Sequence, residues 1–256
     1  MRTLAVIQAR MGSTRLPGKV LSDVGGRSLL ELMLARLSRL AVDDLVVAIP
    51  DGPGDDRLAE VAHHLGATVV LGPEHDVLER FRLALAAHPA DEVVRLTADC
   101  PLLDPGIVEA AIRLRRETEA DYAGNTPMRS FPDGLDVEVL RADVLEAVAA
   151  EAQDRFDREH VTRFVLQRPQ RFRLANLSSG QALGGERWTV DTAADLALVR
   201  SLVAHVDDPH TASWREILAV ARRQAADEVI AVQRHVVADV SIDELSATSS
   251  HPKGPA

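Results

Sequence analysis

The chain has 256 residues, a length that suits one large domain or one domain with a small appendage. Its formal net charge of −10 argues against nucleic-acid binding, because proteins that bind nucleic acids usually carry a basic surface. One cysteine, Cys100, excludes an intrachain disulfide and a multi-cysteine zinc site, and it favours a reducing, cytoplasmic compartment.

The first predicted element is a buried strand at residues 3–9. Its apolar run is too short for a signal peptide, and no stretch of about 18 apolar residues occurs, so we expect no membrane span. Strands alternating with helices indicate a mainly parallel sheet that is covered by helices on both faces. In this region further strands are predicted at 45–49, 68–71 and 92–96, and helices at 28–40, 55–65 and 76–87. Ser28 is a candidate N-cap of the first of these helices, because Glu31 follows three residues later.

The second half of the chain has a less regular pattern. Helices are predicted at 105–118, 142–152, 159–167 and 193–204, and strands at 121–125, 135–140, 171–175 and 187–190. Periodicity fades after about residue 225, and the last ten or so residues are rich in Ser, Pro and Gly. We therefore predict a main domain over 1–225 and a C-terminal extension over 226–256 with a disordered end.

A polar loop with three cations follows the first strand directly. It contains Arg10, Arg15 and Lys19, together with Gly12 and Gly18, which permit close approach of the backbone to a ligand. In sheets of this type, ligands bind beyond the carboxyl ends of the strands, where this loop lies. Guanidinium forks, an ammonium and backbone N–H groups hold polyphosphates. We predict phosphate binding over a merely solvated loop, although the glycine spacing is not that of a Walker A motif.

Two aspartates are predicted at strand ends near this loop. Asp99 follows the strand at 92–96, and Asp191 ends the strand at 187–190. Magnesium is usually held by one or two carboxylates together with water and substrate phosphate oxygens. The pair therefore fits a magnesium site, and the alternatives are a turn residue for Asp99 and a helix cap for Asp191.

A second acidic group lies in the middle of the chain. Asp136 and Glu138 share one face of the strand predicted at 135–140, and Asp133 precedes that strand. These carboxylates either form an exposed polar face or bind hydroxyl or amino groups of a substrate. The residues themselves leave both interpretations open.

Three polar residues, Arg158, Glu159 and His160, stand at the start of the helix predicted at 159–167. His160 is a candidate general base, a hydrogen-bond donor to a substrate, or a core histidine. The motifs of zinc hydrolases, serine hydrolases and thioredoxins do not occur in the sequence, so those chemistries lack support.

The loop motif Gln-Ala-Arg-Met-Gly-Ser-Thr-Arg-Leu-Pro-Gly-Lys-Val-Leu, residues 8–21, resembles the opening motif of the cytidylyltransferase family. That family includes CMP-KDO synthetases, CMP-sialic acid synthetases and the spore-coat polysaccharide biosynthesis protein F group, which this sequence resembles most. The resemblance covers roughly residues 1–201, and one departure is Ala98, where the family more often has glycine. Further similar blocks lie at 76–80, 95–102, 132–138, 158–162 and 189–196.

The resemblance implies a Rossmann-like, glycosyltransferase-A-type nucleotidyltransferase fold, usually homodimeric, with CTP and a small-molecule acceptor as substrates and Mg²⁺ as cofactor. An acceptor hydroxyl would attack the α-phosphorus of CTP and release pyrophosphate. Asp99 and Asp191 would bind the metal and, with Arg15 and Lys19, form the catalytic set. The nucleotide-binding set would be Gln8, Ala9, Arg10, Met11, Gly12, Ser13, Arg15, Lys19, Arg80, Thr97 and Asp99, and the acceptor-binding set Asp133, Asp136, Glu138, Arg158, Glu159 and His160.

Three alternatives to this function remain at the level of the sequence. In the first, the donor is another nucleoside triphosphate. In the second, the acceptor is not a sugar but, for example, a phosphonate. In the third, the chain is a degenerate nucleotide-binding scaffold. The last is disfavoured because both aspartates and all three loop cations are present. An acidic 3-deoxy sugar would need basic partners, for which Arg129, Arg158 and Arg163 are candidates.

Overall fold

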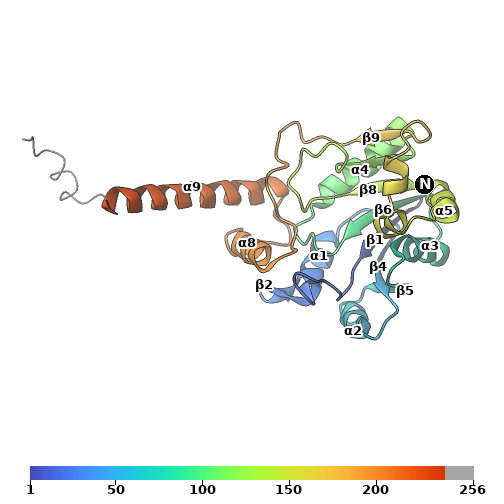
Figure 1. Cartoon of the computed structure of the whole chain (residues 1–256), viewed down its shortest axis with the longest axis horizontal. Coiled ribbons are helices and arrows are strands. Elements are labelled where there is room, and N and C mark those ends of the chain that lie inside the picture. The colour runs from blue at the N-terminus through green and yellow to red at the C-terminus, as the bar shows by residue number, and fades with distance from the viewer. Residues whose placement is uncertain (240–256) are drawn as a thin grey trace, which may run out of the picture.

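The computed structural model describes the backbone of residues 1–239 and the side chains of residues 1–227, so the predicted disordered end lies outside the described residues. Seven strands form one mixed sheet in the order β5–β4–β1–β6–β8–β7–β9 (Figure 1). Neighbours from β5 to β6 run parallel, β8 is antiparallel to β6 and β7, and β9 is parallel to β7. This confirms the predicted mixed, mainly parallel sheet. The strands are β1 (Thr3–Gln8), β4 (Asp44–Pro50), β5 (Thr68–Gly72), β6 (Glu92–Thr97), β7 (Tyr122–Gly124), β8 (Glu138–Arg141) and β9 (Leu174–Asn176).

Helices cover both faces of this sheet, as the alternating pattern predicted. Successive side chains of β1 point to opposite faces, so Leu4 and Val6 enter one core while Ala5 and Ile7 enter the other. Both cores are built mainly from Leu, Val and Ala. Helices α3 (Val77–Ala87), α5 (Ala142–Glu151) and α7 (Arg163–Leu166) pack on one face, and α1 (Leu29–Leu37), α2 (Asp56–His64), α4 (Pro105–Thr118) and α8 (Ala193–Ala204) on the other.

Local capping signals fix where two of these helices begin. The Ser28 hydroxyl accepts a hydrogen bond from the backbone N–H of Glu31 at 3.1 Å, so Ser28 caps α1 as predicted. Thr192 caps α8, and Asp195 completes a reciprocal capping box. The cap of α8 is therefore Thr192 rather than Asp191, which leaves the carboxylate of Asp191 available for other partners.

The middle of the chain differs from the prediction in two places. The helix predicted at 159–167 is two helices, α6 (Arg155–His160) and α7, separated by a tight turn in which Val161 has φ 50° and Thr162 N–H donates to the carbonyl of His160 at 2.5 Å. A valine at positive φ is strained, so this turn runs against the local preference of the residue. The helical periodicity of the sequence therefore gave no sign of it.

The strand predicted at 135–140 is shorter, because β8 begins only at Glu138. Before β8 the chain crosses closely over the segment at 187–190, which forms a single bridge, Asp133 to Arg187, rather than a strand. Gly134 has φ 112°, and a Cβ atom there would lie 2.4 Å from the backbone nitrogen of Thr189. Only glycine fits at this crossing.

The sequence pattern did not predict α9 (Trp214–Asp239), which extends away from the sheet (Figure 1). Its start is tied to the main body by the buried guanidinium of Arg36, which donates to the carbonyls of Leu103 at 3.0 Å, Ala212 at 2.9 Å and also Pro209. The helix runs across residue 225, and the division at that point stays a prediction. Within residues 1–239, no helix combines the length and apolar character needed to cross a bilayer.

Candidate active site

The loop after β1 is a preformed turn rather than a free segment. The Met11 N–H donates to the carboxylate of Asp55 at 2.5 Å, and the Met11 carbonyl accepts from Gly18 N–H at 3.1 Å. Gly18 has φ 68°, a left-handed conformation that leads into the short 3₁₀ helix η1 (Lys19–Leu21). As a result Lys19 is buried while Arg10 and Arg15 stay exposed.

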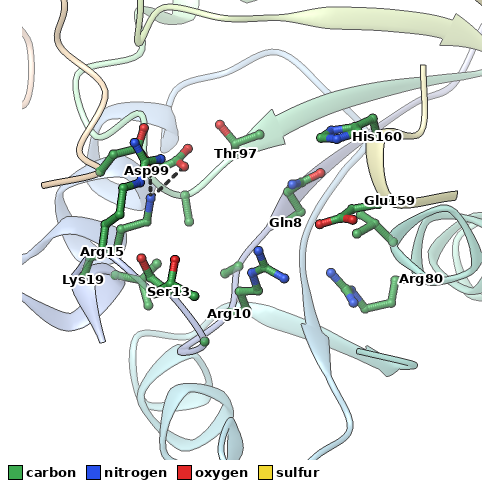
Figure 2. Close-up of a pocket in the computed structure, with 17 residues that line it drawn as sticks. Gln8, Arg10, Ser13, Arg15, Lys19, Arg80, Thr97, Asp99, Glu159 and His160 are labelled. Atoms are coloured by element: carbon green, nitrogen blue, oxygen red, sulfur yellow. Dashed lines mark hydrogen bonds and ion pairs between the residues drawn. The ribbon is translucent and has the colours of Figure 1, made fainter. Parts of the chain in front are cut away.

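The two predicted metal-binding aspartates come together around Lys19, which Figure 2 shows beside Asp99. The Lys19 ammonium lies 3.0 Å from the Asp99 carboxylate and 2.8 Å from that of Asp191. The Arg15 guanidinium contacts the same oxygen of Asp191 at 3.0 Å. The Asp99 carbonyl accepts from Val190 N–H at 2.8 Å, which holds the two carboxyl-bearing segments side by side. The structure therefore brings together all four residues of the predicted catalytic set.

The carboxyl group of Asp191 is held in its charged form. Burial alone would raise its pKa, but the hydrogen bond and charge of Lys19, followed by Arg187 and Arg15, outweigh burial, so the pKa lies below its ordinary value. Both oxygens are engaged, since Arg187 Nη2 contacts Oδ2 at 2.6 Å while Lys19 contacts Oδ1. Asp191 is thus an oriented anion at neutral pH.

A first cavity, which we call the nucleotide cavity, extends from this cluster along the loop toward α3 and α6 (Figure 2). The space free of protein atoms between these residues is about 910 Å³, open solvent included. Every residue of the predicted nucleotide-binding set lines it except Met11, whose side chain packs against the core. Glu159 and His160 also line it at the end away from Asp99.

Arg80 sits at that distant end, buried beside the exposed Arg10 (Figure 2). Its Nη1 donates to the carbonyls of Pro73 at 2.6 Å and Glu74 at 2.9 Å, while its Nε has no partner in the described part of the chain. Burial, and next the charge of Arg10, lower the pKa of Arg80. Two cations held close to one another form a site that favours an incoming anion.

A second cavity, which we call the acceptor cavity, lies on the other side of the aspartate pair. It shares Gln8, Thr97, Asp99 and Asp191 with the nucleotide cavity, so the two cavities meet at the aspartates. Its remaining lining is mostly charged and consists of Arg95, Cys100, Asp133, Asp136, Glu138, Arg187 and Thr189.

The arginines of the acceptor cavity are already paired with carboxylates. Arg187 contacts Asp133 at 2.7 Å, Asp191 at 2.6 Å and Asp195 at 3.2 Å. Arg95 pairs with Glu138. Arg129, which does not line the cavity itself, forms a two-bond pair with the lining residue Asp136 at 2.6 and 2.8 Å. Sequence reasoning missed Arg95 and Arg187 as site residues, although a charged residue within a buried strand such as β6 was a usable signal for Arg95.

Glu138 differs from the other acidic residues because it is 3% exposed and its carboxylate is satisfied by the protein. It accepts hydrogen bonds from Tyr122 Oη at 2.9 Å and Thr162 Oγ1 at 2.8 Å, and it pairs with Arg95. Burial and the Glu138 charge raise the pKa of Tyr122, so the phenol stays a donor. The interpretation as an exposed strand face was wrong for Glu138. Asp133 and Asp136 keep partial exposure in the acceptor cavity.

The structure separates the three predicted acceptor-binding residues at 158–160. Arg158 lines neither cavity, because its guanidinium pairs with Asp76 at 2.6 Å and donates to the carbonyls of Ala149 and Ala152, which anchors α6. Glu159 and His160 line the nucleotide cavity rather than the acceptor cavity. Arg163 is likewise engaged, with Asp157 at 2.5 Å.

A divalent cation could be held here only with help from a ligand. Among the side chains of residues 1–227, no three of His, Cys, Asp or Glu are grouped so that they could hold a metal ion. Asp99 and Asp191 nevertheless both direct an oxygen at one cation, the Lys19 ammonium. Two carboxylates plus phosphate oxygens and water are the donor set that Mg²⁺ prefers, so the residues present fit such a metal.

Comparison with known proteins agrees with this arrangement. A family model described as Cytidylyltransferase matches residues 4–207. The spore coat polysaccharide biosynthesis protein SpsF of Bacillus subtilis is 31% identical over 228 residues, which cover 86% of this chain and 94% of that protein. An uncharacterized protein of Methanocaldococcus jannaschii is 34% identical over 210 residues, which cover 81% of this chain and 85% of its own.

A solved structure resembles the fold closely. A cytidylyltransferase from Leptospira borgpetersenii superposes with a TM-score of 0.84 and 28% identity, covering 88% of this chain and 96% of that one. These similarities confirm the resemblance that the loop motif and the later blocks predicted.

Proposed function

The chain belongs to the cytidylyltransferase family, and on that premise we propose that it transfers CMP from CTP to a sugar or related small-molecule acceptor. The observation that carries the proposal is the meeting of two cavities at Asp99 and Asp191. One cavity is lined by loop cations suited to a triphosphate, and the other by polar groups suited to an acceptor. The α-phosphorus would lie where they meet.

On the nucleotide side, the chain has little covalent chemistry to perform. The acceptor oxygen forms a bond to the α-phosphorus, the bond to pyrophosphate breaks, and the hydroxyl proton is released. Arg10, Arg15 and Lys19 bind the phosphate oxygens and stabilise the charge that develops on the departing pyrophosphate. The preformed loop contributes by holding these cations in place before the nucleotide arrives.

Asp99 and Asp191 are the residues that would hold Mg²⁺. When bound, the ion would neutralise phosphate charge and lower the pKa of the acceptor hydroxyl. Arg187 and the backbone of Val190 contribute by orienting the two carboxyl-bearing segments. The bond from Arg187 orients the Asp191 carboxylate, and the bond from Val190 holds the backbone of Asp99 beside it.

On the acceptor side, Asp133 and Asp136 provide carboxylate oxygens for the hydroxyl groups of the acceptor. A sugar-like acceptor is supported by the name of the Bacillus subtilis relative, which assigns that protein to polysaccharide biosynthesis. Arg129 lies beside both aspartates and would adjust their position when an acceptor binds. The homodimer and the cytoplasmic location remain predictions.

Thermal unfolding with each of CTP, UTP, GTP and ATP, with and without Mg²⁺, tests the nucleotide. A ligand at about 100 times its Kd adds roughly 2.7 kcal/mol, which raises Tm by roughly 5–10 °C in a chain of this size. We expect a shift selective for CTP that Mg²⁺ enhances in the wild type but not in Asp99→Asn. The exposed Asp207→Asn is the matched control.

The outcomes separate the alternatives. A shift with another nucleotide would mean that the donor is not CTP, and no shift with any nucleotide would contradict the proposed function. A nucleotide-induced shift without pyrophosphate release in the presence of any acceptor would favour a degenerate nucleotide-binding scaffold. A CTP-selective shift would be followed by an acceptor screen that measures pyrophosphate release. Release with a phosphonate but with no sugar would contradict the proposed acceptor.

A further inference from the structure

Lys19 takes a position that a metal ion would also need. We infer that its ammonium is the resident cation of the Asp99–Asp191 pair in the free protein, and that the divalent metal enters together with CTP rather than before it. The inference rests on the proposed function, because it assigns an order of binding to that same site. It is carried by the contacts of Lys19 and by the rigidity of its neighbours.

The contacts join three segments that are distant in the sequence. The Lys19 ammonium lies 3.0 Å from Asp99 Oδ2 and 2.8 Å from Asp191 Oδ1, across separations of 80 and 172 residues. The Lys19 side chain is 11% exposed, and those of Asp99 and Asp191 are 30% and 20% exposed. The ammonium is therefore largely removed from water and depends on these two carboxylates for its stabilisation.

A metal ion alone would meet an unfavourable site. Its two positive charges would be placed beside Lys19, with Arg15 and Arg187 also contacting Asp191. If Lys19 moved aside without a new anion, a buried ammonium would lose both partners, which is strongly destabilising. CTP removes this obstacle, because its phosphate oxygens give the ammonium a replacement and supply further ligands to the metal.

The surroundings allow Lys19 to move while the carboxylate of Asp191 and the backbone of Asp99 stay in place. The second oxygen of Asp191 is held by Arg187 at 2.6 Å, and the Asp191 N–H donates to Asp195 at 3.0 Å. The Asp99 carbonyl is fixed by Val190. By contrast the Lys19 ammonium sits on a flexible four-carbon stem and lines the nucleotide cavity, so it can turn toward phosphates.

Linkage then gives a quantitative consequence. If metal and nucleotide each favour the state in which Lys19 has left the carboxylates, each raises the affinity of the other by the same factor. Removing the ammonium should therefore raise metal affinity in the free protein and lower affinity for CTP. These opposite effects separate Lys19 from Arg10, which contacts neither carboxylate among the described residues.

The test titrates Mn²⁺, a divalent cation whose free concentration electron paramagnetic resonance reports, into the protein without nucleotide. Lys19→Met and Lys19→Gln should bind Mn²⁺ roughly tenfold or more tightly than wild type, a typical size for such coupling. Lys19→Arg keeps the charge and should bind as weakly as wild type. Arg10→Met is the matched control, because Arg10 has no carboxylate partner among the described residues, and it should leave Mn²⁺ affinity unchanged.

The double variant Lys19→Gln/Asp99→Asn assigns the gained affinity to the aspartate pair, because it should lose that gain. Mn²⁺ affinity of the free wild type equal to that of folded Lys19→Gln would overturn the inference, and so would a gain that survives Asp99→Asn. These titrations contain no nucleotide and no acceptor. Failure of the proposed function would appear separately, as the absence of a CTP-induced thermal shift in the wild type.

Discussion

The nucleotide cavity and the acceptor cavity meet at the same two aspartates, but their charges are arranged in opposite ways. In the nucleotide cavity, Arg10 makes no ion pair with a described carboxylate, and Arg80 is bonded only to carbonyls. In the acceptor cavity, Arg95 and Arg187 are each paired with carboxylates of the protein. Arg15 and Lys19 are paired with the shared aspartates, so it is the end of the first cavity that contains Arg10 and Arg80 that is prepared for an anion. The second cavity is internally neutralised and presents oriented polar groups.

The difference shows that charge alone does not define where an anionic ligand binds. An arginine whose donors are shared among three carboxylates, as in Arg187, has little left for a ligand. An arginine without such partners attracts one. The following predictions test this contrast, beginning with the junction that both cavities use.

Asp191→Asn should have the largest effect, because it removes a charge at the meeting point of both cavities. We expect kcat/KM to fall roughly a thousandfold, equivalent to about 4 kcal/mol of transition-state stabilisation. Steady-state pyrophosphate release measures the loss, with Asp207→Asn as the matched control. A loss below about tenfold, or about 1.4 kcal/mol, would mean that Asp191 is not part of the reacting centre.

Arg10→Ala and Arg129→Ala compare the cavities directly. Arg10→Ala should raise the KM for CTP by roughly ten- to a hundredfold, since a charge-assisted hydrogen bond contributes about 1.5–3 kcal/mol. Arg129→Ala frees Asp136 and leaves Asp133 paired with Arg187 alone, so it should alter the KM for the acceptor and leave that for CTP within about twofold. Equal effects of both variants on the KM for CTP would contradict the proposed division of roles between the two cavities.

Tyr122→Phe tests whether the Glu138 network is structural. The variant removes the hydrogen bond from the Tyr122 hydroxyl to Glu138, leaving Thr162 as a donor to the same oxygen. Unfolding free energy should fall by about 1 kcal/mol and Tm by roughly 2–4 °C. Thermal unfolding by circular dichroism measures this change. An unchanged Tm with a large loss of activity would instead indicate that Glu138 acts on the acceptor.

The substitution Asp195→Asn should have the smallest effect, and its effect on stability should depend on pH. Burial alone would raise its pKa, but hydrogen bonds from the Asp191 and Thr192 backbone, the Thr192 hydroxyl and Arg187 outweigh burial, so the pKa is lowered. A carboxyl group with a depressed folded-state pKa stabilises the fold above its unfolded value of about 3.9, and this contribution is lost as pH falls through the folded value.

Asp195→Asn should therefore cost about 1 kcal/mol at neutral pH, and the difference from wild type should shrink below about pH 3.9. Urea unfolding at several pH values measures both quantities. If the difference in unfolding free energy between Asp195→Asn and the wild type grew as the pH fell, the pKa of Asp195 would not be lowered by folding.

Local signals in the sequence predicted the first half of the fold well. β1, β4, β5 and β6 lie within about two residues of their predicted positions, as do the helices between them apart from the end of α1. Ser28 was recognised as a cap because its hydroxyl serves the backbone three residues ahead, which depends only on nearby sequence. The loop cations and Asp99 could also be proposed as site residues from nearby sequence alone, because they directly follow predicted strands.

The second half depends on contacts between distant segments, which a single sequence does not contain. The strained turn at Val161 and the crossing of Gly134 over Thr189 are imposed by packing, against local preference. The same holds within the site. The packing of these segments decides which of the two cavities Glu159 lines. It also decides which carboxylates pair with Arg187.

The Arg36 guanidinium has a consequence for how far this chain can be shortened. The family model ends at residue 207, yet two of the three carbonyls that Arg36 contacts belong to Pro209 and Ala212. Burial, the largest influence, already lowers the pKa of Arg36. A chain trimmed at residue 207 would leave this buried cation with the Leu103 carbonyl as the one acceptor remaining of the three, so we expect the minimal folding unit to extend beyond the residues that the family model matches.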